Sequence, residues 1–229
     1  MKCLENPIWN DFTREELRKL KVDEPNEICR KKVLKNWDAI AKPLDGMGKF
    51  ETLIAKIGAI TGTEEIDITK KAVVIMCADN GIVEESVSQS GQEVTVAVAK
   101  AMGKGQSCVG QMAKAVGADT IPIDIGIYSK ESILGVISRK VRCGTRNFRK
   151  EPVMTETETI RAIAIGIEIA FRCKNKGYQI LATGELGIGN TTTSSAVAAA
   201  LLKSEVQKVT GRGAGLKDTD LARKQKVIE

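Results

Sequence analysis

Histidine is absent from the 229 residues, and the six cysteines are scattered without a Cys-x-x-Cys pair. Cysteine thiolate and histidine imidazole are the usual ligands of zinc, so this composition argues against a zinc site. We expect neither a bound metal nor a cofactor. Cys77 lies in an apolar segment and is expected to be a small, buried hydrophobic residue.

Aromatic residues make up only 3% of the chain, too few for platforms on which nucleic-acid bases stack. The net charge of +6 arises from 35 basic and 29 acidic residues that are interleaved along the chain. A mildly basic, solvated surface suits phosphorylated small molecules. We therefore expect small-molecule substrates and no nucleic-acid partner.

Long apolar runs are also missing. The best candidate for a membrane span, residues 162–171, is interrupted by Glu168. The first 20 residues have mixed charge and lack the basic-then-apolar order of a secretory signal. We expect a cytoplasmic protein with reduced thiols and no membrane partner.

The most informative segment is glycine-rich and reads Gly184-Glu185-Leu186-Gly187-Ile188-Gly189-Asn190-Thr191. It follows an apolar run, residues 178–182, which we predict to be a buried strand. It precedes an alanine-rich run, residues 196–202, which predicts a helix. Glycine permits a sharp turn and a close approach to a ligand because it has no Cβ.

Asn190 and Thr191 are favourable N-cap residues, so the helix is predicted to begin there. The unpaired N–H groups and the positive dipole of a helix N-terminus attract anions, most often phosphate. Phosphate would repel the carboxylate of Glu185, which suggests that Glu185 acts on another part of the ligand. The alternative is a tight strand-to-helix turn that binds nothing.

The complete segment resembles the signature of the nicotinate-nucleotide–dimethylbenzimidazole phosphoribosyltransferases, with Leu186 where that family usually has Met. The resemblance implies transfer of phosphoribose from nicotinate mononucleotide to 5,6-dimethylbenzimidazole or a related base. The products would be α-ribazole 5′-phosphate and nicotinate, in the assembly of the cobalamin nucleotide loop. It also implies a homodimer and a Rossmann-like large domain with a small helical domain.

Other segments resemble the same family. Asp79-Asn80-Gly81 follows an apolar strand where the family usually has Asp-His-Gly, and Ser90 matches a position that lines the pocket of the aromatic base. The loop of residues 210–215 resembles a Gly-Arg-Gly-Thr-Gly loop, with Arg212 as its cation and Ala214 replacing the Thr. Lys224 matches a lysine that the family uses near the phosphate.

The remaining pattern alternates strands and helices from residue 71 onward, which favours a doubly wound, mostly parallel α/β sheet with helices on both faces. Strands are predicted at residues 71–78, 119–126 and, as a short one, 136–141. A helix is predicted to run from about residue 95 towards residue 116, with glycines that permit a break. We divide the chain into a helical segment, 1–62, that belongs to the small domain or an interface, and an α/β domain, 63–229.

Helix boundaries and buried stripes follow from capping residues and periodicity. Asn26 is predicted to cap a helix, and the segment of residues 155–158 has the capping-box pattern of another, as does that of residues 13–16. In three helices we expect a stripe of apolar side chains to be buried. The stripes are Ile28, Val33, Trp37 and Ile40; Leu53, Ile54, Ile57 and Ile60; and Ile160, Ile163, Ile167 and Phe171.

Three further polar residues have two interpretations. Arg142 and Arg146 are candidates to hold a phosphate or carboxylate by bidentate contacts, or to pair with surface acids. Asp124, at a predicted strand end, is either a site residue or a structural carboxylate in a turn.

The resemblance implies a mechanism in which Glu185 stabilises the positive charge that develops on the ribose carbon. A second carboxylate, the general base, is expected beyond residue 229, because no Leu-Gly-Glu-Gly motif occurs here and the chain ends within an apparent helix. We therefore expect a chain truncated at its carboxyl end. We expect the amides of Gly187, Ile188, Gly189 and Asn190, with Lys224, to hold the phosphate. Ser90, Asp79, Asn80 and Arg212 are further candidates to bind the phosphate or another part of the substrates.

Two other functions fit the sequence. One is a binding fragment that holds nucleotide or benzimidazole without turnover. The other is a nicotinamide-dependent oxidoreductase, but the acidic residue expected at a strand end about 20 positions after the glycine turn is missing.

Overall fold

The computed structural model describes residues 12–229; Cys3 and part of the predicted helical segment lie outside them. The described chain forms two compact units, one of residues 15–69 and one of residues 12–14 and 70–229. The domain limits inferred from the sequence, 1–62 and 63–229, differ slightly from these units and stay a prediction. The elements, in chain order, are α1 (Arg14–Lys19), α2 (Glu27–Asp38), α3 (Lys49–Thr61), β1 (Lys71–Ala78), the 3₁₀ turn η2 (Gly81–Glu85), α4 (Glu93–Gly103), α5 (Cys108–Ala115), β2 (Ala118–Gly126), β3 (Ile137–Ser138), α6 (Glu156–Asn175), β4 (Ile180–Leu186), α7 (Asn190–Leu202), α8 (Val206–Val209) and α9 (Asp218–Ile228).

The unit of residues 15–69 is built on a pair of helices, α2 and α3. Asn26 caps α2 as predicted, because its side chain accepts hydrogen bonds from the amides of Ile28 and Cys29. The helices approach each other closely where Gly58 faces Val33: a Cβ on Gly58 would lie 2.7 Å from Val33 Cγ2. Small residues thus form the contact face of α3.

The stripes predicted for α2 and α3 are wrong in part. Val33 is buried, but Ile28 and Ile40 are exposed. In α3 the buried residues are Glu51 and the small residues at the α2 contact, and Leu53 and Ile60 are exposed. The physical reason is steric: a close helix–helix contact favours the small face of α3, and the periodicity of large apolar residues does not reveal that face.

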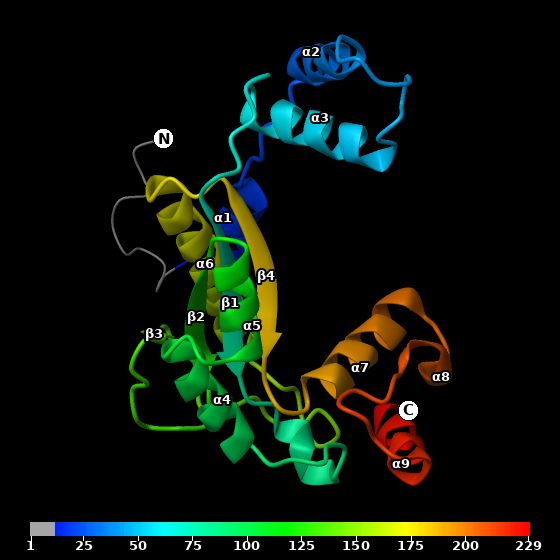
Figure 1. Ribbon diagram of the computed structural model, residues 1–229. Helices are drawn as coiled ribbons and strands as arrows, with labels where there is room; N and C mark the ends of the chain where they lie inside the picture. The colour runs from blue at the N-terminus through cyan, green and yellow to red at the C-terminus, as the bar shows by residue number, and fades with distance from the viewer. Residues whose placement is uncertain (1–11) are drawn as a thin grey trace. The chain divides into compact units, whose positions relative to one another are not determined.

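The larger unit contains a four-stranded parallel sheet in the order β3-β2-β1-β4. β1 has the predicted limits, β2 begins one residue early, and the third strand is confined to two residues (Figure 1). Two helices cover one face of the sheet: Ile75 and Cys77 of β1 pack against Ala99 and Met102 of α4, with Val109 of α5 beside them.

The other face is covered by α6, whose Ile165, Ile169 and Cys173 pack against Val74 and Ile123 of the sheet. The α/β architecture with helices on both faces is therefore confirmed. The predicted stripe of α6 is wrong, because another face of the helix packs on the sheet: Ile163 is exposed, and the buried residues are Ala164, Ile165, Glu168, Ile169 and Cys173.

Two further expectations need correction. The helix predicted between residues 95 and 116 is two helices, α4 and α5, separated at Lys104–Ser107. The strand predicted to be buried, β4, lies at the edge of the sheet and has no buried residue. Its apolar composition is that of an inner strand, but sheet order is set by long-range pairing that a local pattern does not contain. Among residues 12–229, no helix is both long and apolar enough to cross a membrane.

Sheet order also indicates where a ligand site belongs. From β1 the chain proceeds to β2 and β3 on one side and then returns to place β4 on the other side of β1. In doubly wound sheets, ligands bind beyond the carboxyl ends of the two strands at such a reversal. Here those ends lead into Asp79-Asn80 and into the glycine-rich turn that connects β4 to α7 (Figure 1).

Candidate phosphate-binding site

A cleft of about 80 Å³ lies at this switch point. Its walls come from the turn of residues 187–191, the loop of residues 212–216 and the loop of residues 87–89. Gln89 joins two of these walls, because its Nε2 donates a hydrogen bond to the Gly215 carbonyl at 3.0 Å. The cleft therefore combines segments that are more than 100 residues apart in the sequence.

The glycine turn packs tightly on the end of β1. A Cβ on Gly187 would lie 1.9 Å from the Ala78 carbonyl oxygen, and Gly189 has a φ of 88°. Helix α7 begins at Asn190 as predicted, but its N-cap is Gly189 and no side chain caps it. A side chain would therefore clash with the backbone at position 187, and a residue other than glycine would have a strained backbone at position 189.

The amides of the turn differ in what they can offer a ligand. The Asn190 amide donates to the Gly187 carbonyl at 3.1 Å, and the Ile188 amide donates to Thr95 Oγ1 at 3.1 Å. Within the described chain, the amides of Gly189 and Thr191 donate to no protein acceptor. Of the four predicted amides, those of Ile188 and Asn190 are therefore occupied within the protein, whereas those of Gly187 and Gly189, like that of Thr191, have no acceptor in the described chain.

Lys224 reaches the same place from α9. It is only 1% exposed, and its Nζ donates to Thr191 Oγ1 at 2.8 Å and to the Gly211 carbonyl at 3.0 Å. Burial lowers the pKa of Lys224, and among the described residues no carboxylate is paired with it. Three N–H bonds are available on an ammonium group, so two protein contacts leave one for another acceptor.

Asp79 directly follows β1, is not among the residues that line the cleft and has no exposed surface. Its Oδ2 accepts a hydrogen bond from the Tyr128 amide at 2.7 Å. Burial raises the pKa of Asp79, while the neighbouring Thr95 hydroxyl and the Tyr128 amide lower it in part. Although Thr95 is close enough to act on this pKa, Oδ1 has no partner in hydrogen-bonding geometry. Asp79 is thus a buried support of the site and does not line the cleft.

The other predicted residues are placed as follows. Asn80 contacts the glycine turn, because its Nδ2 donates to the Ile188 carbonyl at 3.3 Å. Arg212 lines the cleft, but its guanidinium is engaged by the Leu216 carbonyl and Asp218. Ser90 lies one residue beyond the cleft loop, and its amide donates to Ser88 Oγ.

Glu185 is exposed on β4 and does not line the cleft. It lines a neighbouring open hollow along α7, together with Asn190 and Thr193. Asn190 belongs to both depressions, so a ligand bound over Asn190 would reach both the cleft and Glu185. The expectation that Glu185 acts on a different part of the ligand from the phosphate stays a prediction.

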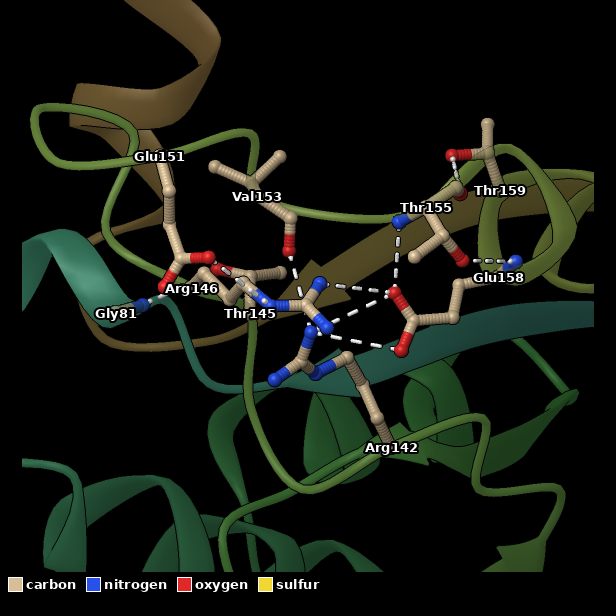
Figure 2. A network of polar contacts seen from close by, with 9 residues as sticks. All are labelled: Gly81, Arg142, Thr145, Arg146, Glu151, Val153, Thr155, Glu158 and Thr159. Carbon is tan, nitrogen blue, oxygen red and sulfur yellow. Dashed lines mark hydrogen bonds and ion pairs between the residues drawn. The ribbon is translucent and has the colours of Figure 1, made fainter.

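Arg142 and Arg146 are committed elsewhere. Both point at Glu158, at the start of α6, with Arg146 Nη1 3.1 Å from Glu158 Oε2 (Figure 2). Arg142 Nη1 is 3.5 Å from both carboxylate oxygens. Of the two alternatives, the structure shows pairing with acids. Asp124 is likewise structural: it pairs with Lys140 at 3.0 Å and accepts from the Ile127 amide.

Three residues of the site were not anticipated from the sequence. Thr95 and Gln89 contact the glycine turn and the opposite loop, and Thr191 Oγ1 accepts from Lys224. Thr95 is on a helix and Gln89 in a polar loop, so neither carries a local signal. Thr191 was noted only as a capping residue.

Comparisons with known proteins identify the family of this chain. A family model described as DBI_PRT, phosphoribosyltransferase, matches residues 22–229. The chain belongs to this phosphoribosyltransferase family. A nicotinate-nucleotide–dimethylbenzimidazole phosphoribosyltransferase of Acetivibrio thermocellus is 43% identical over 206 residues, which are 90% of this chain and 58% of that protein. The enzyme of the same description from Clostridium perfringens is 44% identical over 84% of this chain and 53% of its own length.

The fold of the family is shared as well. The crystal structure of CobT from Thermus thermophilus matches with a TM-score of 0.83 and 34% identity, over 88% of this chain and 61% of that one. The present chain spans little more than half the length of the curated relatives in this phosphoribosyltransferase family.

Proposed function

We propose that this chain binds nicotinate mononucleotide and takes part in transferring its phosphoribose to 5,6-dimethylbenzimidazole. The products would be nicotinate and α-ribazole 5′-phosphate, the nucleotide of the cobalamin lower ligand. Membership of the phosphoribosyltransferase family and the activity for which its relatives are named support this proposal.

The observation that carries it is the environment of Lys224. A buried ammonium without a carboxylate partner is costly, because burial removes water from the charge. Its cost is offset if an anion binds beside it. Its Nζ bonds Thr191 Oγ1, and Thr191 lines the cleft at the α7 N-terminus, where the Gly189 and Thr191 amides are also unpaired within the described chain. Helix dipole, two amides and one ammonium together favour a phosphate monoester.

The transfer chemistry fits the hollow beside Asn190. Nicotinate leaves as a neutral pyridine nitrogen, so its departure needs little acid catalysis. Positive charge develops on the ribose carbon, and the carboxylate of Glu185 would stabilise it. The benzimidazole must lose a proton to a base, which we assign to no described residue of this chain.

Two measurements test the proposal: binding of nicotinate mononucleotide and release of nicotinate. We expect titration calorimetry to show binding of nicotinate mononucleotide to the purified chain, and Lys224→Met to weaken it by about 10- to 100-fold, the range for a hydrogen bond to a charged group. Unchanged affinity in Lys224→Met would remove the phosphate assignment.

Chromatography of nicotinate, with dimethylbenzimidazole present, decides whether there is turnover. If nicotinate is released, Glu185→Gln is expected to lower kcat with little change in KM, because its contact forms in the transition state. Binding without release would support the alternative of a non-catalytic fragment. If the chain neither bound nicotinate mononucleotide nor released nicotinate, both functions would be rejected.

We also propose a homodimer that resides in the cytoplasm, as the family resemblance implies. Light scattering after size-exclusion chromatography would show a mass of twice 24.7 kDa if the dimer forms.

A further inference from the structure

The peptide of Ile188, in the middle of the glycine turn, is held from both sides by side chains of other elements. Its N–H donates to Thr95 Oγ1 of α4 at 3.1 Å. Its carbonyl accepts from Asn80 Nδ2, at the end of β1, at 3.3 Å. We refer to Thr95 and Asn80 together as the Ile188 clamp.

Both members of the clamp are themselves fixed. Thr95 has no exposed surface and Asn80 is 6% exposed. Asn80 Oδ1 accepts from the Thr193 hydroxyl at 2.9 Å, which sets the orientation of the amide and directs Nδ2 at Ile188. Gln92 Nε2 donates to the Asn80 carbonyl at 3.4 Å. The clamp therefore connects β1, α4 and α7 through one peptide.

A turn with glycine on both sides of Ile188 has many accessible conformations, and ordering it costs conformational entropy. If the clamp orders the turn before a ligand arrives, that cost does not reduce binding affinity. The clamp also occupies the Ile188 amide, whereas the Gly189 and Thr191 amides on either side of Asn190 stay available at the cleft.

We propose that Thr95 and Asn80 are positioning residues, which hold the Ile188 peptide so that the Gly189 and Thr191 amides are preorganised for a phosphate group. Neither side chain is expected to touch the ligand. The proposal rests on the proposed function only in that the ligand is a phosphate ester. The clamp itself is tested without any ligand.

The first experiment is amide hydrogen exchange by NMR on the full 229-residue chain. Thr95→Val removes the acceptor and keeps the shape, and it is expected to speed exchange of the Ile188 amide at least tenfold. Thr95→Ser retains Oγ and should restore protection. Thr192→Val is the matched control, since Thr192 is equally buried but its Oγ1 has no partner. Equal exchange of the Ile188 amide in wild type and Thr95→Val would overturn the clamp.

The second experiment is titration calorimetry with nicotinate mononucleotide. Thr95→Val and Asn80→Ala are each expected to raise the dissociation constant about three- to tenfold, as for loss of one neutral hydrogen bond. Thr95→Ser and Thr192→Val should bind as wild type does. Faster exchange in Thr95→Val with unchanged affinity would refute the positioning role.

The two proposals fail separately. A wild-type chain that does not bind the nucleotide counts against the proposed function and against a role of the clamp in binding, while the exchange measurement still decides whether the clamp holds the turn. A variant that unfolds is recognised by loss of protection throughout β1 and β2. If Thr95→Val unfolds, Asn80→Ala, which removes the other contact of the clamp, is compared with Thr192→Val instead.

Discussion

Burial of the single residue Asp79 makes the free energy of unfolding depend on pH. Its carboxyl group has no exposed surface, and burial raises its pKa above the ordinary value of 3.8. Between 3.8 and that raised pKa the native state binds more protons than the unfolded state does. The free energy of unfolding therefore falls as pH rises through this window.

We predict that Asp79→Asn gains stability relative to wild type as pH rises through the same window, because the variant has no charge to bury. The gain is about 1.4 kcal/mol for each unit by which the pKa is raised. Urea unfolding at several pH values from about 4 to about 8 measures it. Asp67→Asn is the control, since hydrogen bonds from Thr69 lower the pKa of Asp67 below the ordinary value of 3.8, and its difference from wild type should stay constant above about pH 5. A pH-independent difference between Asp79→Asn and wild type would contradict the prediction.

Gly187 shows what a single residue does not reveal in a sequence. The pattern correctly indicates a position where a side chain has no room, but it leaves open whether a tight turn or an approaching ligand imposes the requirement. In the structure the obstacle is the Ala78 carbonyl, 1.9 Å from where a Cβ would stand. A glycine needed for strand contact and one needed for ligand approach look the same in a sequence.

At the scale of elements, the signals that depend on adjacent residues are the reliable ones. Asn26 and Thr155 are confirmed as N-caps, and β1 has its predicted limits. The apolar stripe of α6 and the burial of β4 are wrong, because both depend on which distant element packs there. Nothing local distinguishes an apolar edge strand from an apolar inner strand.

The N-terminus of α6 carries a capping box whose carboxylate has a second task. Glu158 accepts from the Thr155 amide at 2.8 Å, and Thr155 Oγ1 accepts from the Glu158 amide at 3.1 Å (Figure 2). The pKa of Glu158 is lowered most by the hydrogen bond from the Thr155 amide, and the Arg146 and Arg142 guanidinium groups lower it further. The cap thereby connects α6 to the loop that carries both arginines.

We predict that Thr155→Ala lowers the free energy of unfolding by about 1 kcal/mol, the usual cost of losing an N-cap side chain. Thr157→Ala, in the same turn but not at the cap, is the matched control and should be neutral or slightly stabilising. Denaturant unfolding at about pH 7 measures both. Because the pKa of Glu158 is lowered, its contribution is present above the ordinary value of 4.5 and is lost as pH falls through the lowered pKa. Equal effects of the two substitutions would show that the cap does not stabilise α6.

At the scale of the whole molecule, the site and the pair of helices α2 and α3 belong to different compact units. Every residue that lines the cleft lies between residues 87 and 216, and Lys224 lies on α9, all within the larger unit. In the sequence, the only indication that the site lies in the α/β unit is that the predicted site residues all follow residue 62. The convergence of β1, β4, α4, α7 and α9 at one cleft follows from sheet topology, which arises from pairing between segments about 100 residues apart.

We predict that disturbing the contact between α2 and α3 leaves the cleft intact. In Gly58→Ala the new Cβ would lie 2.7 Å from Val33 Cγ2 and 2.9 Å from the Thr63 carbonyl, and such overpacking costs about 1–3 kcal/mol. Gly166→Ala, in α6, is the matched control, because no atom lies within 4 Å of its Cβ position. Hydrogen exchange should show loss of protection in residues 27–61 in Gly58→Ala only, while both variants bind nicotinate mononucleotide as wild type does. If Gly58→Ala instead lost affinity to the extent expected of Lys224→Met, the phosphate site would depend on residues 15–69 and would not be a property of the α/β unit alone.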